Sequence, residues 1–337
     1  ALHFRHINAQ SHDHSAAHPR PDYTVRTMPK RRSSAKKPAI RKRTAPRPLL
    51  LSPPWVMHRS RGLGILQLTP LRKLPWLVHG FSTRRGGASV LNGQAVLNLS
   101  FMEWDSRENV AENRRLLQAA LRAEDFTLAP LKQIHSDAIR LFCAAPALAC
   151  KGDASLTNRQ GLLLAVQTAD CVPILLVDPQ KRAVAAIHAG WKGTLARIAE
   201  KAVGRMRLEF GSKPADLLAA LGPSIGPCCY EVGAEFVTKF TAQFADASEY
   251  FDEPRTGDEP NPLQWLSMVP PGHQPPPRNV HLDLSKANRA QLLAAGLRRP
   301  NIFVSGLCTA CHTDLFFSHR REGGHTGRLM SVIGIRS

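Results

Sequence analysis

The sequence lacks the features that would place it at once in several common classes of protein. No stretch of its 337 residues approaches the roughly 18 consecutive apolar residues that a membrane-spanning helix requires. It has no G-x-x-x-x-G-K-[ST] phosphate loop and no G-x-G-x-x-G fingerprint, and no segment repeats at the period of a solenoid. We therefore expect neither a membrane protein, nor a dinucleotide-binding turn, nor a repeat array.

Acidic residues are scarce relative to basic ones, with 26 Asp and Glu against 45 Lys and Arg and a net charge of +19. Residues 1–60 hold 13 Lys or Arg against only Asp13 and Asp22, and so contribute +11 of that total. This segment is rich in Pro and Ser and shows neither helical nor strand periodicity. We predict a disordered basic leader over residues 1–62.

The basic clusters at residues 30–37 and 41–43 leave nucleic-acid binding open as an alternative function, because cationic segments release counterions from a phosphate backbone. Neither cluster contains an aromatic residue that could stack on a base. A solvated tail is the better-supported interpretation, and nucleic acid is not the expected partner.

Cysteine occurs seven times, an odd number, and two of these residues, Cys228 and Cys229, are adjacent. Such a set does not suit a framework of disulfides. The leader also lacks the apolar segment and small-residue cleavage site of a secretory signal. We therefore predict a reducing, cytoplasmic environment. Cys308 and Cys311 form a C-x2-C pair, but no second pair lies near them in the sequence, and a turn or packing role is at least as well supported as metal or redox chemistry.

Hydrophobic residues make up 43% of the chain, enough for a sizeable core. A helix is predicted over residues 106–121, with Ser106 as its N-cap, and another over residues 194–209. Short apolar runs predict strands, and these alternate only partly with the helices. The runs are residues 161–166, 174–177, 183–187, 216–221 and 302–307. The fold class predicted is a layered α/β sandwich with mixed sheets.

One catalytic domain is predicted over residues 63–337, because the informative motifs are interleaved along one continuous span. Residues 252–278 are dense in Pro, Gly and acidic side chains. They are predicted to be a loop insertion within that domain.

Three residues in separate segments, His135, Cys171 and His188, are candidates for one metal centre. Two imidazoles and a thiolate suit zinc, and three protein ligands leave one position for water or substrate. The intervals between them, 36 and 17 residues, are unlike the close pairs of structural zinc sites. Each residue taken alone is more often a packed core side chain than a ligand. Cys171 and His188 follow strand-like runs, however, and such positions hold reactive groups on a rigid frame.

A series of motifs resembles, in content and in order, the laccase-domain proteins, a family long named for multicopper polyphenol oxidase. They are FSTRRGG (81–87), LNL (97–99), ENR (112–114), KQIH (132–135), TADCVPI (168–174), HAGWKGT (188–194), GPSIGPCCYE (222–231), CTAC (308–311) and FFSHRREGG (316–324). The resemblance covers residues 74–335. It implies purine nucleoside phosphorylase and adenosine deaminase activity.

The resemblance also implies specific roles for residues of this chain. His135, Cys171 and His188 would bind one zinc ion, with copper the less suitable metal, since an oxidase needs about ten copper ligands. Arg84 would be a catalytic residue and an anchor for phosphate or substrate. The expected substrates are adenosine, inosine, guanosine or methylthioadenosine, which phosphate would split into free base and ribose 1-phosphate.

Other residues of these motifs have two possible roles each. Asp170 either takes part in acid–base catalysis or orients a ligand, and Asp137 could also orient an imidazole. Lys192 and Arg320 either contact substrate or lie on a solvated surface.

Two positions differ from the pattern usual in the family. Ser136 replaces a frequent Gly, and His319 replaces a frequent Tyr. Neither change removes a predicted metal ligand.

A different enzyme remains possible from the residues alone. Cys171 could be a nucleophile activated by His135 or His188, as in a Cys-His amidase acting on peptidoglycan precursors. Dependence of activity on metal separates the two hypotheses.

Overall fold

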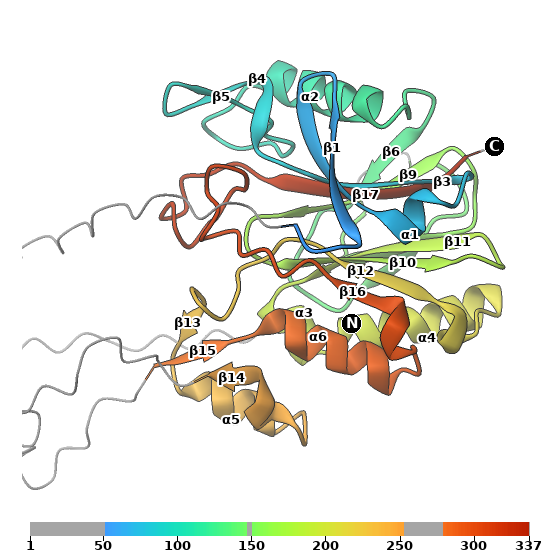
Figure 1. The fold of residues 1–337 in the computed structure, drawn as a ribbon, viewed down its shortest axis with the longest axis vertical. Coiled ribbons are helices and arrows are strands. Elements are labelled where there is room, and N and C mark those ends of the chain that lie inside the picture. Colours follow the sequence, from blue (N-terminus) through green and yellow to red (C-terminus); the bar gives the residue numbers. More distant parts are fainter. Residues whose placement is uncertain (1–50, 147–149, 253–278, 337) are drawn as a thin grey trace, which may run out of the picture. The chain divides into compact units, whose positions relative to one another are not determined.

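The computed structural model describes residues 51–146, 150–252 and 279–336. Within these ranges the chain forms four layers, in which two sheets pack face to face and helices cover the outer side of each (Figure 1). The prediction of a layered α/β fold with mixed sheets is confirmed. No helix in the described part of the chain is long and apolar enough to cross a membrane.

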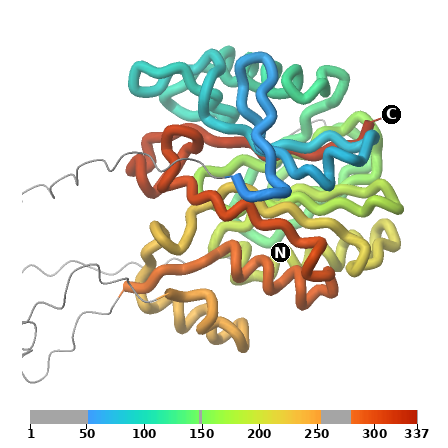
Figure 2. Tube along the Cα trace, in the orientation of Figure 1, coloured from blue at the N-terminus to red at the C-terminus, as the bar shows by residue number. Residues whose placement is uncertain are grey.

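The first sheet has six strands and contains both the first and the last described strands of the chain. In spatial order they are β1 (Trp55–Ser60), β2 (Leu63–Leu68), β3 (Leu77–Ser82), β17 (Leu329–Ile335), β9 (Leu162–Thr168) and β6 (Thr127–Pro130). All neighbours are antiparallel except β6 and β9, and β17 lies beside β3 although the two are far apart in sequence (Figure 2).

The second sheet also has six strands, with β10 and β11 at its centre. In order they are β16 (Ile302–Val304), β12 (Leu218–Leu221), β10 (Val172–Asp178), β11 (Ala183–Ala189), β8 (Ala154–Thr157) and β7 (Ile139–Leu141). The β12–β16 and β7–β8 pairs are parallel, and the others are antiparallel.

Helices lie on both outer faces. They are α2 (Arg107–Ala120), α3 (Trp191–Leu195), α4 (Ile198–Phe210), α5 (Glu235–Thr241) and α6 (Leu284–Ala294). The short helix α1 (Thr69–Arg72) instead contributes Leu71 to the core between the sheets. Short 3-10 turns are η1 (Pro214–Asp216), η2 (Ala247–Tyr250) and η4 (Arg299–Asn301). Two small sheets complete the described structure, formed by β4 (Arg85–Leu91) with β5 (Gln94–Val96), and by β13 (Glu231–Val232), β15 (Val280–Leu282) and β14 (Phe251–Asp252).

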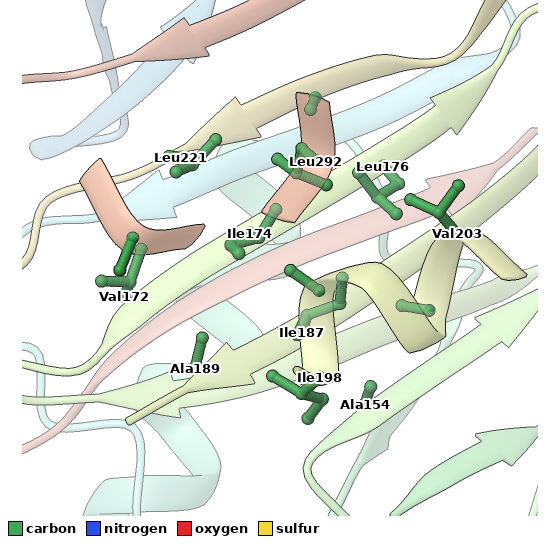
Figure 3. Close-up of a cluster of buried hydrophobic side chains, with 14 of the residues drawn as sticks. Ala154, Val172, Ile174, Leu176, Ile187, Ala189, Ile198, Val203, Leu221 and Leu292 are labelled. Atoms are coloured by element: carbon green, nitrogen blue, oxygen red, sulfur yellow. The ribbon is translucent and has the colours of Figure 1, made fainter. Parts of the chain in front are cut away.

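The central strands are apolar on both faces because each face meets a different core. In β10, Ile174 and Leu176 point into a cluster shared with α4 and α6, which Figure 3 shows in close-up. Leu175 and Val177 point the other way, into the cluster between the two sheets. This explains why the sequence of such strands is a continuous apolar run without the alternation of a half-exposed strand.

Helix α2 begins where the sequence predicts it, with the Ser106 hydroxyl accepting a hydrogen bond from the Asn109 N–H at 3.1 Å. The helix predicted over residues 194–209 is confirmed from Ile198 onward as α4, but it does not continue back to Thr194. Arg197 adopts a left-handed conformation, with φ of 60°, and separates α3 from α4.

The predicted end of the leader at residue 62 lies too far along the chain. Strand β1 begins at Trp55, whose side chain is buried against Phe81 in the core between the sheets. The rest of the predicted leader, residues 1–50, and nearly all of the predicted insertion, residues 253–278, lie outside the described residues.

Candidate active site

The structure brings His135, Cys171 and His188 together at one edge of the second sheet. Cys171 immediately precedes β10 and His188 is the next-to-last residue of β11, and these strands are hydrogen-bonded neighbours. His135 lies in the loop after β6. One ligand atom of each residue lies within 4.8 Å of those of the other two.

The three side chains differ in how far they are exposed to solvent. His188 is buried, Cys171 is partly buried, and His135 is exposed. The imidazole rings of His135 and His188 are 4.9 Å apart and nearly perpendicular. A reactant can therefore reach the three residues from the side of His135. His188 and the ends of the strands close the opposite, buried side.

Gly190 leaves space for the group. A Cβ atom at this position would lie 3.0 Å from the Cys171 sulfur and 3.4 Å from a ring carbon of His135. Glycine here therefore has a packing reason, because any larger residue would occupy part of the space beside the sulfur.

Asp153, which no sequence motif indicated, organises the site from beneath. This buried carboxylate lies 2.9 Å from His188 Nδ1 and accepts hydrogen bonds from the backbone N–H groups of His135 at 3.0 Å and Ser136 at 2.7 Å. The Ser136 hydroxyl also donates to it at 2.8 Å, so the serine found in place of the family's frequent glycine adds a bond. A carboxylate on Nδ1 leaves Nε2 of His188 free to bind a ligand.

The ionisation states of these groups depend on one another. Burial acts to raise the pKa of Cys171, but the positive charge of His188 and hydrogen bonds from both histidines outweigh it and lower this pKa to about 6. Burial acts to lower the pKa of His188, but the charge of Cys171 and the bond to Asp153 raise it to about 9. A thiolate is therefore available near neutral pH, as both a metal ligand and a nucleophile require.

Two residues of the site have backbone conformations that are unusual for non-glycine residues. His135 has φ of 56° and Asp170 has φ of 89°. Such conformations persist only where surrounding contacts hold them, and they concentrate at functional sites.

Asp170 is held in place by contacts with two loops. Its carboxylate accepts from the Thr309 hydroxyl at 2.6 Å and from the Arg320 backbone N–H at 2.7 Å, while its carbonyl accepts from Ile225 N–H at 2.9 Å. These contacts favour a positioning role for the residue before Cys171 over acid–base chemistry.

The predicted substrate anchors lie in different surroundings. Arg84 is buried, pairs with Glu322 at 2.9 Å, donates to the Thr313 carbonyl at 2.6 Å and covers the Phe317 ring. Its charge is thus already balanced within the protein. Lys192 is exposed beside the Trp191 ring.

The Arg320 side chain lies beside Tyr230 and Glu231. Its exposed guanidinium donates to the Glu231 carbonyl at 2.6 Å and covers the Tyr230 ring. Asp137, the other acid considered beside His135, forms an ion pair with Lys201 and does not bond to an imidazole among the described residues.

Arg328, which lies outside the motifs, and Tyr230, which lies within the GPSIGPCCYE motif, are further residues near the group that sequence reasoning did not assign to the site. Burial lowers the pKa of Arg328, while the charges of Cys171 and Asp170 oppose that shift. Burial and the charge of Cys171 raise the pKa of Tyr230 to about 12. No pattern in the sequence distinguishes Arg328 from the chain's other arginines, whereas the GPSIGPCCYE motif could have drawn attention to Tyr230.

Residues 78–336 match the family described as "Multi-copper polyphenol oxidoreductase laccase". The chain belongs to this family. The resemblance found in the motifs is therefore confirmed.

Relatives extend the comparison. A protein of Deinococcus radiodurans named "Purine nucleoside phosphorylase" is 40% identical over 270 residues, covering 79% of this chain and 93% of the relative. "Adenosine deaminase RL5", from an unknown prokaryotic organism, is 35% identical over 266 residues, covering 76% of this chain and 93% of that protein. A solved structure of the hypothetical protein YfiH of Bacillus licheniformis is 31% identical, with a TM-score of 0.71, covering 85% of this chain and all of that one. The two named relatives carry the names of enzymes, which confirms the prediction of an enzyme.

Proposed function

We propose that the chain is a zinc-dependent purine nucleoside phosphorylase that also deaminates adenosine. It would combine adenosine, inosine, guanosine or methylthioadenosine with phosphate and release the free base and ribose 1-phosphate. The observation that carries this proposal is the convergence of a thiolate and two imidazoles, both of which Asp153 supports, in a chain similar to a named purine nucleoside phosphorylase.

The residues present fit a zinc ion. His135, Cys171 and His188 offer nitrogen and sulfur donors within reach of one ion, the space beside Gly190 is kept open, and Asp153 fixes the ring of the buried histidine. When bound there, zinc would supply a Lewis acid with one coordination position left for a reactant. Copper oxidase chemistry is not part of the proposal, because the group offers only three ligands.

In phosphorolysis a phosphate oxygen forms a bond to the sugar C1′ as the bond from C1′ to the purine nitrogen breaks. The purine leaves with the electron pair and takes up a proton. We assign phosphate binding to Arg328, which interacts electrostatically with Cys171 and Asp170, and to Arg320, whose guanidinium lies over the Tyr230 ring. Arg84, already paired with Glu322, is assigned to holding the loop that carries Arg320.

Deamination would use the same three residues, His135, Cys171 and His188, but water in place of phosphate as the attacking group. Water would add to C6 of adenine, and ammonia would leave with one of its protons. Asp153 would hold His188 in the tautomer that binds the ion, so Cys171 and His188 would act as ligands and not as proton donors in this reaction. The Tyr230 ring beside Arg320 offers an aromatic surface for a purine.

The lowered pKa of Cys171 also suits the Cys-His amidase considered from the sequence. Nucleoside chemistry is preferred, because it is the chemistry in the names of the relatives.

The direct test is to incubate the purified full chain with adenosine, with and without phosphate, and to identify the products by mass. Adenine with ribose 1-phosphate supports phosphorolysis, and inosine supports deamination. Cys171→Ser should abolish both, whereas Cys143→Ser, at an exposed cysteine, should leave them unchanged. Turnover that survives complete removal of metal would contradict zinc dependence, and formation of neither adenine nor inosine would reject the proposal.

A further inference from the structure

Four of the remaining cysteines meet at a second place in the protein. Cys228 and Cys229 lie in the turn after β12, and Cys308 and Cys311 lie in the turn after β16. Their sulfur atoms all lie within 4.8 Å of one another. Cys311 Sγ is 3.5 Å from both Cys228 Sγ and Cys229 Sγ.

The topology explains why pairs so distant in the sequence converge. Strands β12 and β16 are parallel neighbours, so their carboxyl ends lie at the same edge of the sheet. The segments that follow stay together through a bridge between Ser224 and Cys308, with Ser224 N–H donating to the Leu307 carbonyl and Thr309 N–H to the Ser224 carbonyl. The second pair that the C-x2-C motif lacked in the sequence is thus supplied by the fold.

We propose that Cys228, Cys229, Cys308 and Cys311 bind one zinc ion in a closed, structural site. Sulfur ligands at about 2.3 Å from zinc stand about 3.8 Å apart at the corners of a regular tetrahedron. The two distances of 3.5 Å are close to that spacing, so only small side-chain movements would be needed. Four sulfur ligands in a tetrahedron suit zinc and leave no position for a reactant.

The surroundings favour a bound thiolate over a loose group of thiols. Cys308 is buried, its sulfur accepts a hydrogen bond from Gly226 N–H at 3.2 Å, and Cys311 N–H also donates to it. Donors aimed at a sulfur stabilise its negative charge. The Arg321 guanidinium donates to the Ala310 carbonyl at 3.2 Å, which places a positive charge beside the cluster. This charge would offset part of the negative charge that remains when four thiolates bind one divalent ion.

A disulfide explains the arrangement less completely. Cys311 is equally distant from Cys228 and Cys229, so neither is the preferred partner, and any one bond would leave the other two thiols facing it. A single ion uses all four sulfurs at once.

The position of the cluster indicates what the zinc ion would stabilise. Thr309, between two of the four cysteines, donates to the Asp170 carboxylate, and Ile225, shortly before the other two, donates to the Asp170 carbonyl. Zinc here would tie together the two loops that hold Asp170. Its removal should therefore lower the melting temperature and loosen these loops.

The experiment measures metal per chain in the full-length protein, purified with a reductant and analysed by mass spectrometry of the elements. We expect Cys311→Ser to bind one zinc ion fewer than the wild type and Cys143→Ser to bind the same amount. Cys171→Ser reports separately on the candidate active site, so failure of that centre and failure of this site are distinguishable. Cys311 is exposed, so its replacement by serine should leave the chain folded.

Alkylation provides a second readout without substitution. In the zinc-bound protein Cys228, Cys229 and Cys311 should resist iodoacetamide and become reactive after chelation, while exposed Cys143 reacts in both states. Equal zinc content in wild type and Cys311→Ser would overturn the proposal, as would iron or copper in place of zinc. A wild-type mass lower by two hydrogens under denaturing, nonreducing conditions, with no metal bound, would show a disulfide and overturn it as well.

Discussion

Asp153 is the residue on which the geometry of the candidate site most depends. Burial acts to raise its pKa, but hydrogen bonds from His188 and from the Ser136 N–H and hydroxyl lower it to about 2. It is therefore ionised under all ordinary conditions. A single charged group thus orients one imidazole and the backbone that carries the other.

Asp153→Asn should lower kcat/KM for adenosine phosphorolysis about 10–100-fold, the usual effect of losing the partner of a metal-binding histidine. An amide keeps the volume but turns a donor toward N–H groups that need an acceptor. Steady-state kinetics and metal content measure the effect. Asp137→Asn makes the same chemical change at a partly exposed ion pair with Lys201 and should alter kcat/KM by less than about twofold. Equal effects of the two changes would contradict the role of Asp153.

His79 gives the protein a pH-dependent stability unrelated to the active site. It lies in β3, buried, and its Nε2 accepts a hydrogen bond from Leu68 N–H at 3.0 Å. Burial, and to a smaller extent the positive charge of Arg72, lower its pKa to about 3. The unfolded chain binds a proton at this position below its ordinary pKa of 6.5, whereas the folded chain does not until about pH 3. The free energy of unfolding therefore decreases as the pH falls through this window.

Between pH 7.5 and 5.0 the wild type should lose about 2 kcal/mol more stability than His79→Gln, whose amide can still accept from Leu68 but cannot titrate. Urea unfolding at the two pH values measures this difference. His58→Gln, on partly exposed β1, controls for loss of an imidazole. Parallel pH profiles for wild type and His79→Gln would contradict the prediction.

At the scale of elements, replacing glycine by alanine should have opposite effects in strand β17 and in helix α4. Gly334 lies in β17, where an added Cβ would be 2.5 Å from the Leu162 carbonyl oxygen and 2.8 Å from a ring carbon of Phe126. Gly204 lies inside α4 on an exposed face, where an added Cβ would meet nothing within 4 Å. The strand interior is closed to a methyl group and the helix surface is open to one.

Gly204→Ala should therefore raise the free energy of unfolding by about 0.5–1 kcal/mol, because alanine restricts the unfolded chain and favours the helix. Gly334→Ala should lower it by about 1–3 kcal/mol through overpacking. The midpoint of urea unfolding measures both, and each variant controls for the other. A stabilising Gly334→Ala would show that β17 does not pack tightly against the Leu162 backbone and the Phe126 ring.

Local sequence patterns predicted where strands occur but not how the strands pair. The apolar runs at residues 161–166 and 183–187 correspond to β9 and β11, because a run that is apolar at every position requires burial on both faces. Which sheet each strand joins is not encoded in the run itself. β9 pairs with β17 in the first sheet and β11 with β10 in the second, through contacts between segments far apart in the chain.

At the scale of the whole molecule, the described fold begins near residue 51. Deleting residues 1–45 should leave kcat/KM within about twofold of the full chain and reduce retention on heparin, because basic clusters bind polyanions by releasing counterions. Deletion through residue 62 should instead destabilise the protein, since it removes β1 and the buried Trp55. Loss of turnover on the shorter deletion would favour a catalytic or binding role for the leader.

The sequence by itself determined the local elements and the chemical type of the candidate site. Residues 107–120 form a helix with a serine cap, and the KQIH, TADC and HAGW motifs supply donors that suit zinc. These features depend on neighbours along the chain or on side-chain chemistry. Only the tertiary structure decided that Asp153 supports two of the donors, that Glu322 neutralises Arg84 and that two distant cysteine pairs meet. Each of those contacts joins segments that are far apart in the sequence. Only the pairing of strands into sheets brings such segments together.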